Sequence, residues 1–311
     1  MIEFTWDKNA EITAQDIPDG TEKLVFGNIF NSKLKANVFP ISLKSIKFGY
    51  NFNQPIDEDV LPEFLERLKF KGEFNQPIRK NILPNSLKSI ELGFDFDQPI
   101  SVGVLPDSLQ YIDFGLRFNH PIGVGVLPKN LEIIELGCYF NQPICVGVLP
   151  ETLHTIYFSF VFNQPIYENV LPKNLINVGF GHDFSHPIDT KFLPDTLEYI
   201  ALSEHEIDID FESLPSSLKY LFVENFATLE LLNNISDRMH FSVFFFAKLR
   251  KIPNIKYPIY YDSSRKYDEI RNSGKYEIIG TKTLNDKTYD KIIIPAFYQP
   301  VSRCKSARNC V

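Results

Sequence analysis

Residues that build metal centres and disulfide scaffolds are scarce in this sequence. Its 311 residues include four cysteines, two methionines and six histidines. The cysteines are Cys138, Cys145, Cys304 and Cys310, too few and too widely spaced for a disulfide scaffold. No CxxC or HxxxH spacing accompanies them. We therefore expect no bound metal and reduced thiols, with pairing of Cys304 and Cys310 under oxidation as the alternative.

Basic charge and long apolar runs are lacking too. Lysine and arginine number 32 against 39 acidic residues, and the net charge of −7 argues against a general affinity for nucleic acid. The longest hydrophobic run, residues 241–247, is far shorter than the roughly 20 residues that cross a bilayer, and a signal-peptide pattern is absent. Without a glycine-rich phosphate loop or a nucleophile elbow, we predict no catalytic residue, cofactor or small-molecule substrate, and no enzymatic activity.

Phenylalanine, in contrast, is abundant, with 28 residues, and many belong to a repeated five-residue motif. The motif Phe-Asn-Gln-Pro-Ile occurs in identical or nearly identical copies at a constant spacing of 22 residues. Its leading phenylalanines are Phe52, Phe74, Phe96, Phe118, Phe140, Phe162 and Phe184, and a degenerate copy begins at Phe30. A fixed period of this length indicates a tandem-repeat solenoid.

Each repeat unit opens on a leucine, for example Leu87, and places apolar residues fourth and sixth, here Ile90 and Leu92. This alternation predicts a short strand with one face directed inward. A glycine usually follows in seventh place, where we expect the chain to leave the strand sharply. Two prolines per unit, here Pro99 and Pro106, disfavour a helix on the return path, so we predict an extended or 3-10 back wall.

The seventeenth place of the unit favours residues that tolerate a positive φ angle. It is occupied by Asp59, Asn81, Gly103, Gly125, Gly147, Asn169 and Lys191. All but the lysine are aspartate, asparagine or glycine, so a left-handed turn is predicted to recur there.

The unit resembles the leucine-rich repeat, except that its asparagine comes eleventh instead of ninth, directly after a phenylalanine. With that change it resembles the FNIP-repeat proteins, known mainly from social amoebae and giant viruses. The resemblance covers roughly residues 17–226. It implies a leucine-rich-repeat-like solenoid for which no enzymatic activity is established in the family. Many members carry an F-box that recruits a ubiquitin ligase, and the short segment before the first repeat leads us to expect none here.

The repeated polar residues of the motif are interpreted as structural. We expect the asparagines to stack in register as a turn-to-turn ladder that satisfies buried polar groups, above a core filled by the motif phenylalanines. The ladder asparagines are Asn53, Asn75, Asn119, Asn141 and Asn163.

Three segments are expected along the chain. Residues 1–16 form an N-terminal cap with an edge strand, and residues 17–226 form a solenoid of about nine to ten units. Residues 227–311 lack the repeat and are predicted to form a mixed α/β cap. Its expected strands are 241–246, 257–261, 275–279 and 291–295, and its expected helices are 229–235 and 264–272. The protein is expected in the cytoplasm, that of the host if it is viral, with virion association left open.

The third and fifth places of each unit should point outward onto one continuous strand face. This face is basic at its start, acidic in the middle and aromatic or small towards its end. Its candidate protein-binding residues are Lys47, Arg67, Lys69, Glu91, Tyr111, Asp113, Glu135 and Tyr157. Exposed tyrosines on a rigid surface suit protein recognition, whereas Tyr199, Tyr220 and Phe222 are expected to pack against the C-terminal cap.

The favoured function is a non-enzymatic scaffold that binds a protein, a host protein if the chain is viral, through this strand face. One alternative is a self-associating unit, for example a homodimer formed through exchanged or docked caps. Another is an enzyme within residues 227–311. Neither nucleic acid nor membrane is an expected partner.

Overall fold

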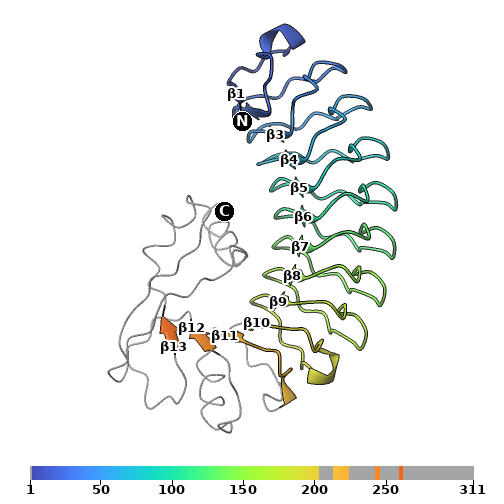
Figure 1. Ribbon diagram of the computed structural model, residues 1–311, viewed down its shortest axis with the longest axis vertical. Coiled ribbons are helices and arrows are strands. Elements are labelled where there is room, and N and C mark those ends of the chain that lie inside the picture. The colour runs from blue at the N-terminus through green and yellow to red at the C-terminus, as the bar shows by residue number, and fades with distance from the viewer. Residues whose placement is uncertain (1, 203–212, 224–241, 246–258, 262–311) are drawn as a thin grey trace.

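The protein is a parallel β-solenoid whose strands form one continuous sheet. The computed structural model describes residues 2–202, 213–223, 242–245 and 259–261. Thirteen short strands lie side by side in sequence order and line the inner side of an arc, with the return loops on its outer side (Figure 1). They are β1 (Glu3–Trp6), β2 (Lys23–Phe26), β3 (Ser45–Lys47), β4 (Arg67–Lys69), β5 (Ser89–Glu91), β6 (Tyr111–Asp113), β7 (Ile133–Glu135), β8 (Thr155–Tyr157), β9 (Asn177–Gly179), β10 (Tyr199–Leu202), β11 (Tyr220–Val223), β12 (Ser242–Phe245) and β13 (Ile259–Tyr261).

Equivalent places of successive units stand next to each other because the sheet register equals the sequence period. Ser45 pairs with Arg67, and Arg67 with Ser89, each 22 residues further along the chain. The predicted parallel strand face is therefore confirmed. Helix is limited, within the described ranges, to two 3-10 turns, η1 (Ala14–Asp16) and η2 (Thr190–Phe192), and the rest of the back wall consists of turns and extended segments.

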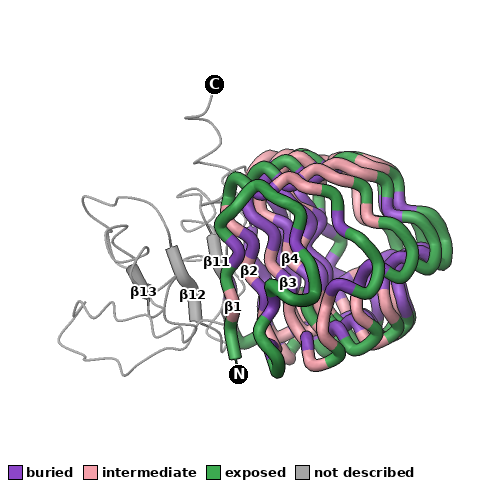
Figure 2. The backbone as a smooth tube through the Cα atoms, turned by 90° about the horizontal axis from the view of Figure 1, so that it is seen from above, coloured by how far each residue is buried: buried purple, intermediate pink, exposed green. Residues whose placement is uncertain are grey.

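The motif phenylalanines form a continuous stack through the core. Successive rings from Phe52 to Phe184 lie 6.1–6.2 Å apart, centroid to centroid, with nearly parallel planes. Figure 2 shows the buried residues along the inside of the turns. A single unit could not bury these rings, so the core depends on stacking.

The asparagines form the expected ladder, but at the surface rather than in the core. The side-chain oxygen of Asn141 accepts a hydrogen bond from the backbone N–H of Asn163 at 2.9 Å. It also accepts one from Nε2 of Gln164 at 3.1 Å, so the motif glutamine is a second donor that the sequence did not suggest. Of the five ladder residues, Asn119 is exposed and the others are half-buried. The ladder starts earlier than expected, because Asn9 accepts from the N–H of Asn31.

The seventh place needs a glycine mainly because the backbones of adjacent turns come close together there, and less because the chain bends sharply. A Cβ at Gly137 would stand 2.0 Å from the carbonyl oxygen of Gly115 in the preceding turn. Adjacent backbones therefore approach too closely there for a side chain.

The predicted left-handed turn is confirmed at six of the seven seventeenth places. The φ angles are 60–65° at Asp59, Asn81 and Asn169 and 79–81° at Gly103, Gly125 and Gly147. The exception is Lys191, which lies in η2. Asn37, one period before Asp59, adopts the same conformation.

The parallel sheet continues at both ends beyond the repeats recognised in the sequence. At the start, β1 pairs with β2 as the expected edge strand. Towards the end, β12 and β13 lie within two expected strands and extend the sheet in parallel from β11, past residue 226. The expected strands 275–279 and 291–295 and both expected helices lie outside the described residues.

Candidate functional site

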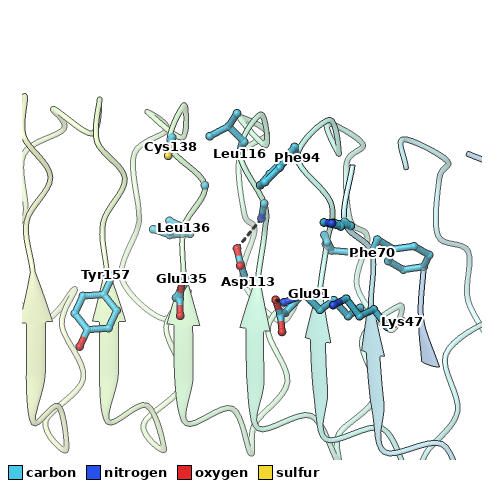
Figure 3. A pocket seen from close by; sticks show the side chains of 15 residues that line it. Lys47, Phe70, Glu91, Phe94, Asp113, Leu116, Glu135, Leu136, Cys138 and Tyr157 are labelled. Atoms are coloured by element: carbon cyan, nitrogen blue, oxygen red, sulfur yellow. Dashed lines mark hydrogen bonds and ion pairs between the residues drawn. The ribbon is translucent and has the colours of Figure 1, made fainter. Parts of the chain in front are cut away.

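A pocket of about 220 Å³ opens on the strand face, at the ends of β3 to β8 (Figure 3). Its rim is built by the fifth-place side chains of six successive units. They are Lys47, Lys69, Glu91, Asp113, Glu135 and Tyr157. Each belongs to the last residue of its strand, and each pairs in register with the next along the sheet. Because neighbouring strands are about 4.8 Å apart, these six groups form one row.

The row changes sign in its middle. Lys47 and Lys69 are adjacent at its start, and Lys71 adds a third cation to the pocket lining. Burial, and then the charges of Lys69, Lys71 and Lys23, lower the pKa of Lys47. An anionic group placed there would relieve this repulsion between cations.

An ion pair marks the change of sign. The ammonium group of Lys69 contacts the carboxylate of Glu91 on the next strand. Asp113 and Glu135 follow on β6 and β7, so three carboxylates lie on three neighbouring strands. Like charges this close repel one another, which makes this end of the pocket suited to cationic groups.

Hydrogen bonds hold the carboxylates in place. Oδ1 of Asp113 accepts from the backbone N–H of Gly115 at 2.8 Å, and Oε1 of Glu135 accepts from the hydroxyl of Tyr111 at 2.9 Å. Burial, followed by the charges of Glu135, Asp113 and Glu91, raises the pKa of Tyr111 strongly. This hydroxyl therefore remains a proton donor to Glu135 well above neutral pH.

The wall and floor of the pocket are apolar. Phe70, Leu92, Phe94, Leu116 and Leu136, from the segments that follow the strands, line it. An occupant would therefore combine charged ends with an apolar contact surface.

The predicted binding residues are only partly brought together. Six of the eight line the pocket, whereas Arg67 and Tyr111 are third-place residues that lie beside it. Two of the six are not exposed as expected, since Asp113 is 5% and Tyr157 is 3% exposed. Part of the burial of Tyr157 has a local cause, because its ring occupies the space where Gly179 has no side chain. Burial also raises the pKa of Tyr157, with a smaller contribution from Glu135.

Sequence reasoning missed the residues that follow the strands. Lys71, Phe94, Leu116 and Cys138 lie in the seventh and eighth places, where we looked only for a turn. Lys71 could have been recognised, because it replaces the usual seventh-place glycine beside the basic start of the face.

The expectation of reduced cysteines is wrong for Cys138. Cys138 takes part in a disulfide, whereas Cys145 is a free and exposed thiol. The spacing of cysteines along a sequence does not show which of them the fold brings together, so this bond could not have been predicted. Cys304 and Cys310 lie outside the described residues.

Neither a metal centre nor a spanning helix is found in the described part of the chain. In these residues His, Cys, Asp and Glu do not form a group of three or more that could hold a metal ion. Within the same residues, no helix is long and apolar enough to traverse a bilayer.

Comparison with known proteins agrees with the repeat pattern. The model of the FNIP repeat matches residues 9–51, 30–73, 52–95, 74–117, 118–160 and 162–205. Among solved structures, the chain is similar to the crystal structure of CroV588, a giant-virus protein described as a novel circular leucine-rich-repeat structure. The two share 35% sequence identity with a TM-score of 0.66, over 79% of this chain and 40% of that one.

The chain thus spans less than half the length of the structure that it resembles. No curated protein matches its sequence. The fold is a leucine-rich-repeat-like solenoid, of a type that typically serves protein binding. Because the repeat model covers most of the described solenoid, the chain belongs to the FNIP repeat family.

Proposed function

We propose that the protein is a non-enzymatic scaffold that binds a protein segment through the pocket of the strand face. The row of fifth-place side chains carries this proposal, because it places cations, anions and an apolar floor within one pocket. A host protein in the cytoplasm is the partner that we propose. Its contact segment would carry an acidic group towards Lys47 and an apolar side chain against Phe94 and Leu116, which line the pocket and are half-buried.

The charge pattern supports recognition more than catalysis. Lys69 and Glu91 are engaged with each other, and Asp113 and Glu135 accept hydrogen bonds from their own chain. Groups held in this way provide a fixed pattern of charge, which steers association and selects among partners. A rigid sheet also binds with little loss of conformational entropy.

Charge reversal at the basic end tests this function. A triple variant, Lys47→Glu with Arg67→Glu and Lys69→Glu, is compared with the wild-type chain in partner capture from host lysate, followed by mass spectrometry. The proteins that bind specifically are those that the variant loses. A matched control reverses three exposed lysines that do not line the pocket, Lys129, Lys173 and Lys191. We expect the control to keep the partner, since its substitutions leave the strand face intact.

Binding through the strand face would be refuted if the triple variant, shown to be folded by circular dichroism, captured the same proteins as the wild type. Loss of binding in both variants would equally argue against this face, since it would reflect net charge alone. For a partner identified in this way, isothermal titration at two salt concentrations adds a second measurement. Affinity should weaken as salt rises, because exposed charge pairs are screened.

Self-association is a second candidate, favoured by the open edge of the sheet. Among the described strands β1 has a sheet neighbour on one side only, and Ile2 beside it is 52% exposed. Unpaired strand edges are sites where a second chain can add. In this proposal two copies dock or exchange their terminal segments. Light scattering of the full chain tests it: a homodimer should dissociate on Ile2→Lys, and a monomer at high concentration would eliminate the idea.

A further inference from the structure

Exposed apolar side chains gather on the outer side of the arc, at the sixteenth place of three successive units. Val102, Val124 and Val146 are 54%, 64% and 57% exposed. They belong to the return loops, on the opposite side of the turns from the strand face (Figure 1). Each valine stands between two small, exposed residues, and none of these residues carries a charge. We call this surface the back ridge, and it consists of residues 101–103, 123–125 and 145–147.

The three turns of the back ridge lie against one another and form a continuous surface. A Cβ at Gly125 would lie 3.9 Å from Cγ1 of Val102, and one at Gly147 would lie 4.0 Å from Cγ2 of Val124. Both glycines adopt a positive φ angle, of 79° and 81°, and leave the valines standing free above the backbone. An exposed apolar surface of this kind, with charged residues at its ends, marks a site of association.

The charges at the two ends of the back ridge are opposite. Lys80 occupies the sixteenth place one unit before the ridge, and Glu168 occupies the same place one unit after it. Both side chains are exposed. Val124 is the midpoint, because it lies two units from each of them. A second copy of the ridge running in the opposite direction would therefore place each lysine against a glutamate and each valine against a valine.

The fifteenth place has the same symmetry. Arg79 and Tyr167 are exposed at two units before and two units after the midpoint. A guanidinium group stacks favourably on a tyrosine ring, so these two residues also suit a reversed copy. One unit further out, Asp57 and Asp189 are like charges. Because the ridge lies on the outer side of the arc, two copies diverge towards their ends, and this outermost pair falls outside the contact (Figure 1).

Other arrangements of two ridges lose this complementarity. Two copies running in the same direction would place Lys80 against Lys80, and like charges repel. A shift of the reversed copy by one unit would place Lys80 against Val146 or Glu168 against Val102. Both shifts leave a charged group facing an apolar side chain, where its hydration is partly lost.

We propose that two copies of the chain associate through their back ridges in an antiparallel, two-fold symmetric dimer centred on Val124. Such a contact is isologous, so each pair of Lys80 with Glu168 of the second copy occurs twice. The contact involves only five turns of each copy, which is small for a protein interface and predicts a weak dimer. Both strand faces remain open, so the dimer presents two copies of the pocket. Dimerisation goes beyond the proposed function and does not depend on it, because it uses the opposite side of the turns.

Charge exchange tests the antiparallel arrangement. Analytical ultracentrifugation of the full chain should show a dimer that dissociates on dilution. Lys80→Glu and Glu168→Lys should each weaken dimerisation about tenfold, because each replaces two exposed ion pairs by repulsion. The double variant should restore it, whereas Lys173→Glu, an exposed residue outside the ridge, should have no effect. A double variant as weak as the single ones, or a wild type that is monomeric at about 1 mM, would overturn the proposal.

Substitution at the midpoint separates this contact from association through the edge of the sheet. Val124→Lys brings two ammonium groups together at the two-fold axis and should abolish the dimer. Ile41→Lys is the matched control, because Ile41 is 75% exposed and lies outside the ridge. Ile2→Lys at the sheet edge should also leave the dimer unchanged. A dimer that survives Val124→Lys and is lost on Ile2→Lys would form through the edge and would refute the ridge contact.

A disulfide trap gives the register directly. Ser101→Cys places a thiol opposite Cys145 of the second copy, which is a free and exposed thiol in the wild type. Within one chain these two residues are two turns apart, about 10 Å, whereas a disulfide requires Cα atoms within about 7 Å. Treatment with glutathione disulfide should therefore give a covalent dimer, and digestion without reduction should recover the peptides of residues 101 and 145 joined. Adding Cys145→Ser should remove this cross-link. Absence of the joined peptides in a dimeric variant would contradict the antiparallel register.

Discussion

Replacing one ladder asparagine by alanine should weaken the contact between two adjacent turns. In the wild type, Oδ1 of Asn141 accepts from the N–H of Asn163 at 2.9 Å and from Nε2 of Gln164 at 3.1 Å. Asn141→Ala removes this acceptor and both hydrogen bonds. The N–H of Asn141 itself keeps its bond to Asn119, so the loss is confined to one junction.

The expected loss is about 1–2 kcal/mol. Each neutral hydrogen bond contributes about 1 kcal/mol net, and the half-buried N–H of Asn163 can bond to water instead, which limits the penalty. Asn141→Asp is the matched control, because it keeps an acceptor oxygen at the same place. The native ladder already contains this case, since Asp97 accepts from the N–H of Asn119 at 3.1 Å. The control should lose less than about 0.5 kcal/mol.

Native-state hydrogen exchange is the appropriate assay, because long repeat arrays do not always unfold in one cooperative step. The amide of Asn163 should exchange roughly five to thirty times faster in Asn141→Ala than in the wild type, which corresponds to about 1–2 kcal/mol. The amide of Asn75, bonded to Asn53 several turns away, should not change. If Asn141→Asp accelerated exchange as much as Asn141→Ala, the acceptor oxygen would not be the source of the stability.

Three further predictions concern the core, the turn junctions and alkaline pH. Phe140→Ala removes a ring stacked 6.1 and 6.2 Å from its two neighbours, and should reduce the free energy of unfolding in urea by about 3–5 kcal/mol. Gly137→Ala should lower the free energy of unfolding by about 1–3 kcal/mol in the same assay, because its Cβ would lie 2.0 Å from a carbonyl oxygen. Gly123→Ala should be tolerated, because the nearest contact of its Cβ is at 3.9 Å. Because the pKa of Tyr111 is raised in the folded state, its contribution to folding stability is present below about pH 10 and lost as the pH rises further. The unfolding temperature of the wild type should therefore fall more steeply above about pH 10 than that of Tyr111→Phe. Equal slopes would refute the burial argument.

The fold could be read from the sequence to the level of individual places in the repeat. The spacing of Phe52, Phe74 and their equivalents predicted the stack, and residues such as Asn81 and Gly125 predicted the left-handed turns. Both predictions depend on local sequence patterns that recur in every unit. The reason for the seventh-place glycine was harder to recognise, because it lies in the distance between two backbones 22 residues apart.

The candidate site could be predicted only in part. Outward places followed from the alternation of the strand, which identified Lys47, Glu91 and Glu135. The alternation did not show which outward side chains are buried. Asp113 and Tyr157 occupy the same alternating places as exposed residues and differ only in their surroundings. The apolar floor was missed for a related reason, since Phe94 and Leu116 lie after the strands, where the pattern carries no alternation.

The repeat period and its apolar places were enough to specify a solenoid with a parallel strand face, because every unit buries its motif phenylalanine only by stacking on an equivalent unit. The pattern that specifies one turn of the solenoid is therefore repeated along the sequence. The row of side chains that runs from Lys47 to Tyr157 depends instead on residues that do not repeat. Their proximity arises when the turns stack at strand spacing, and no local pattern encodes it.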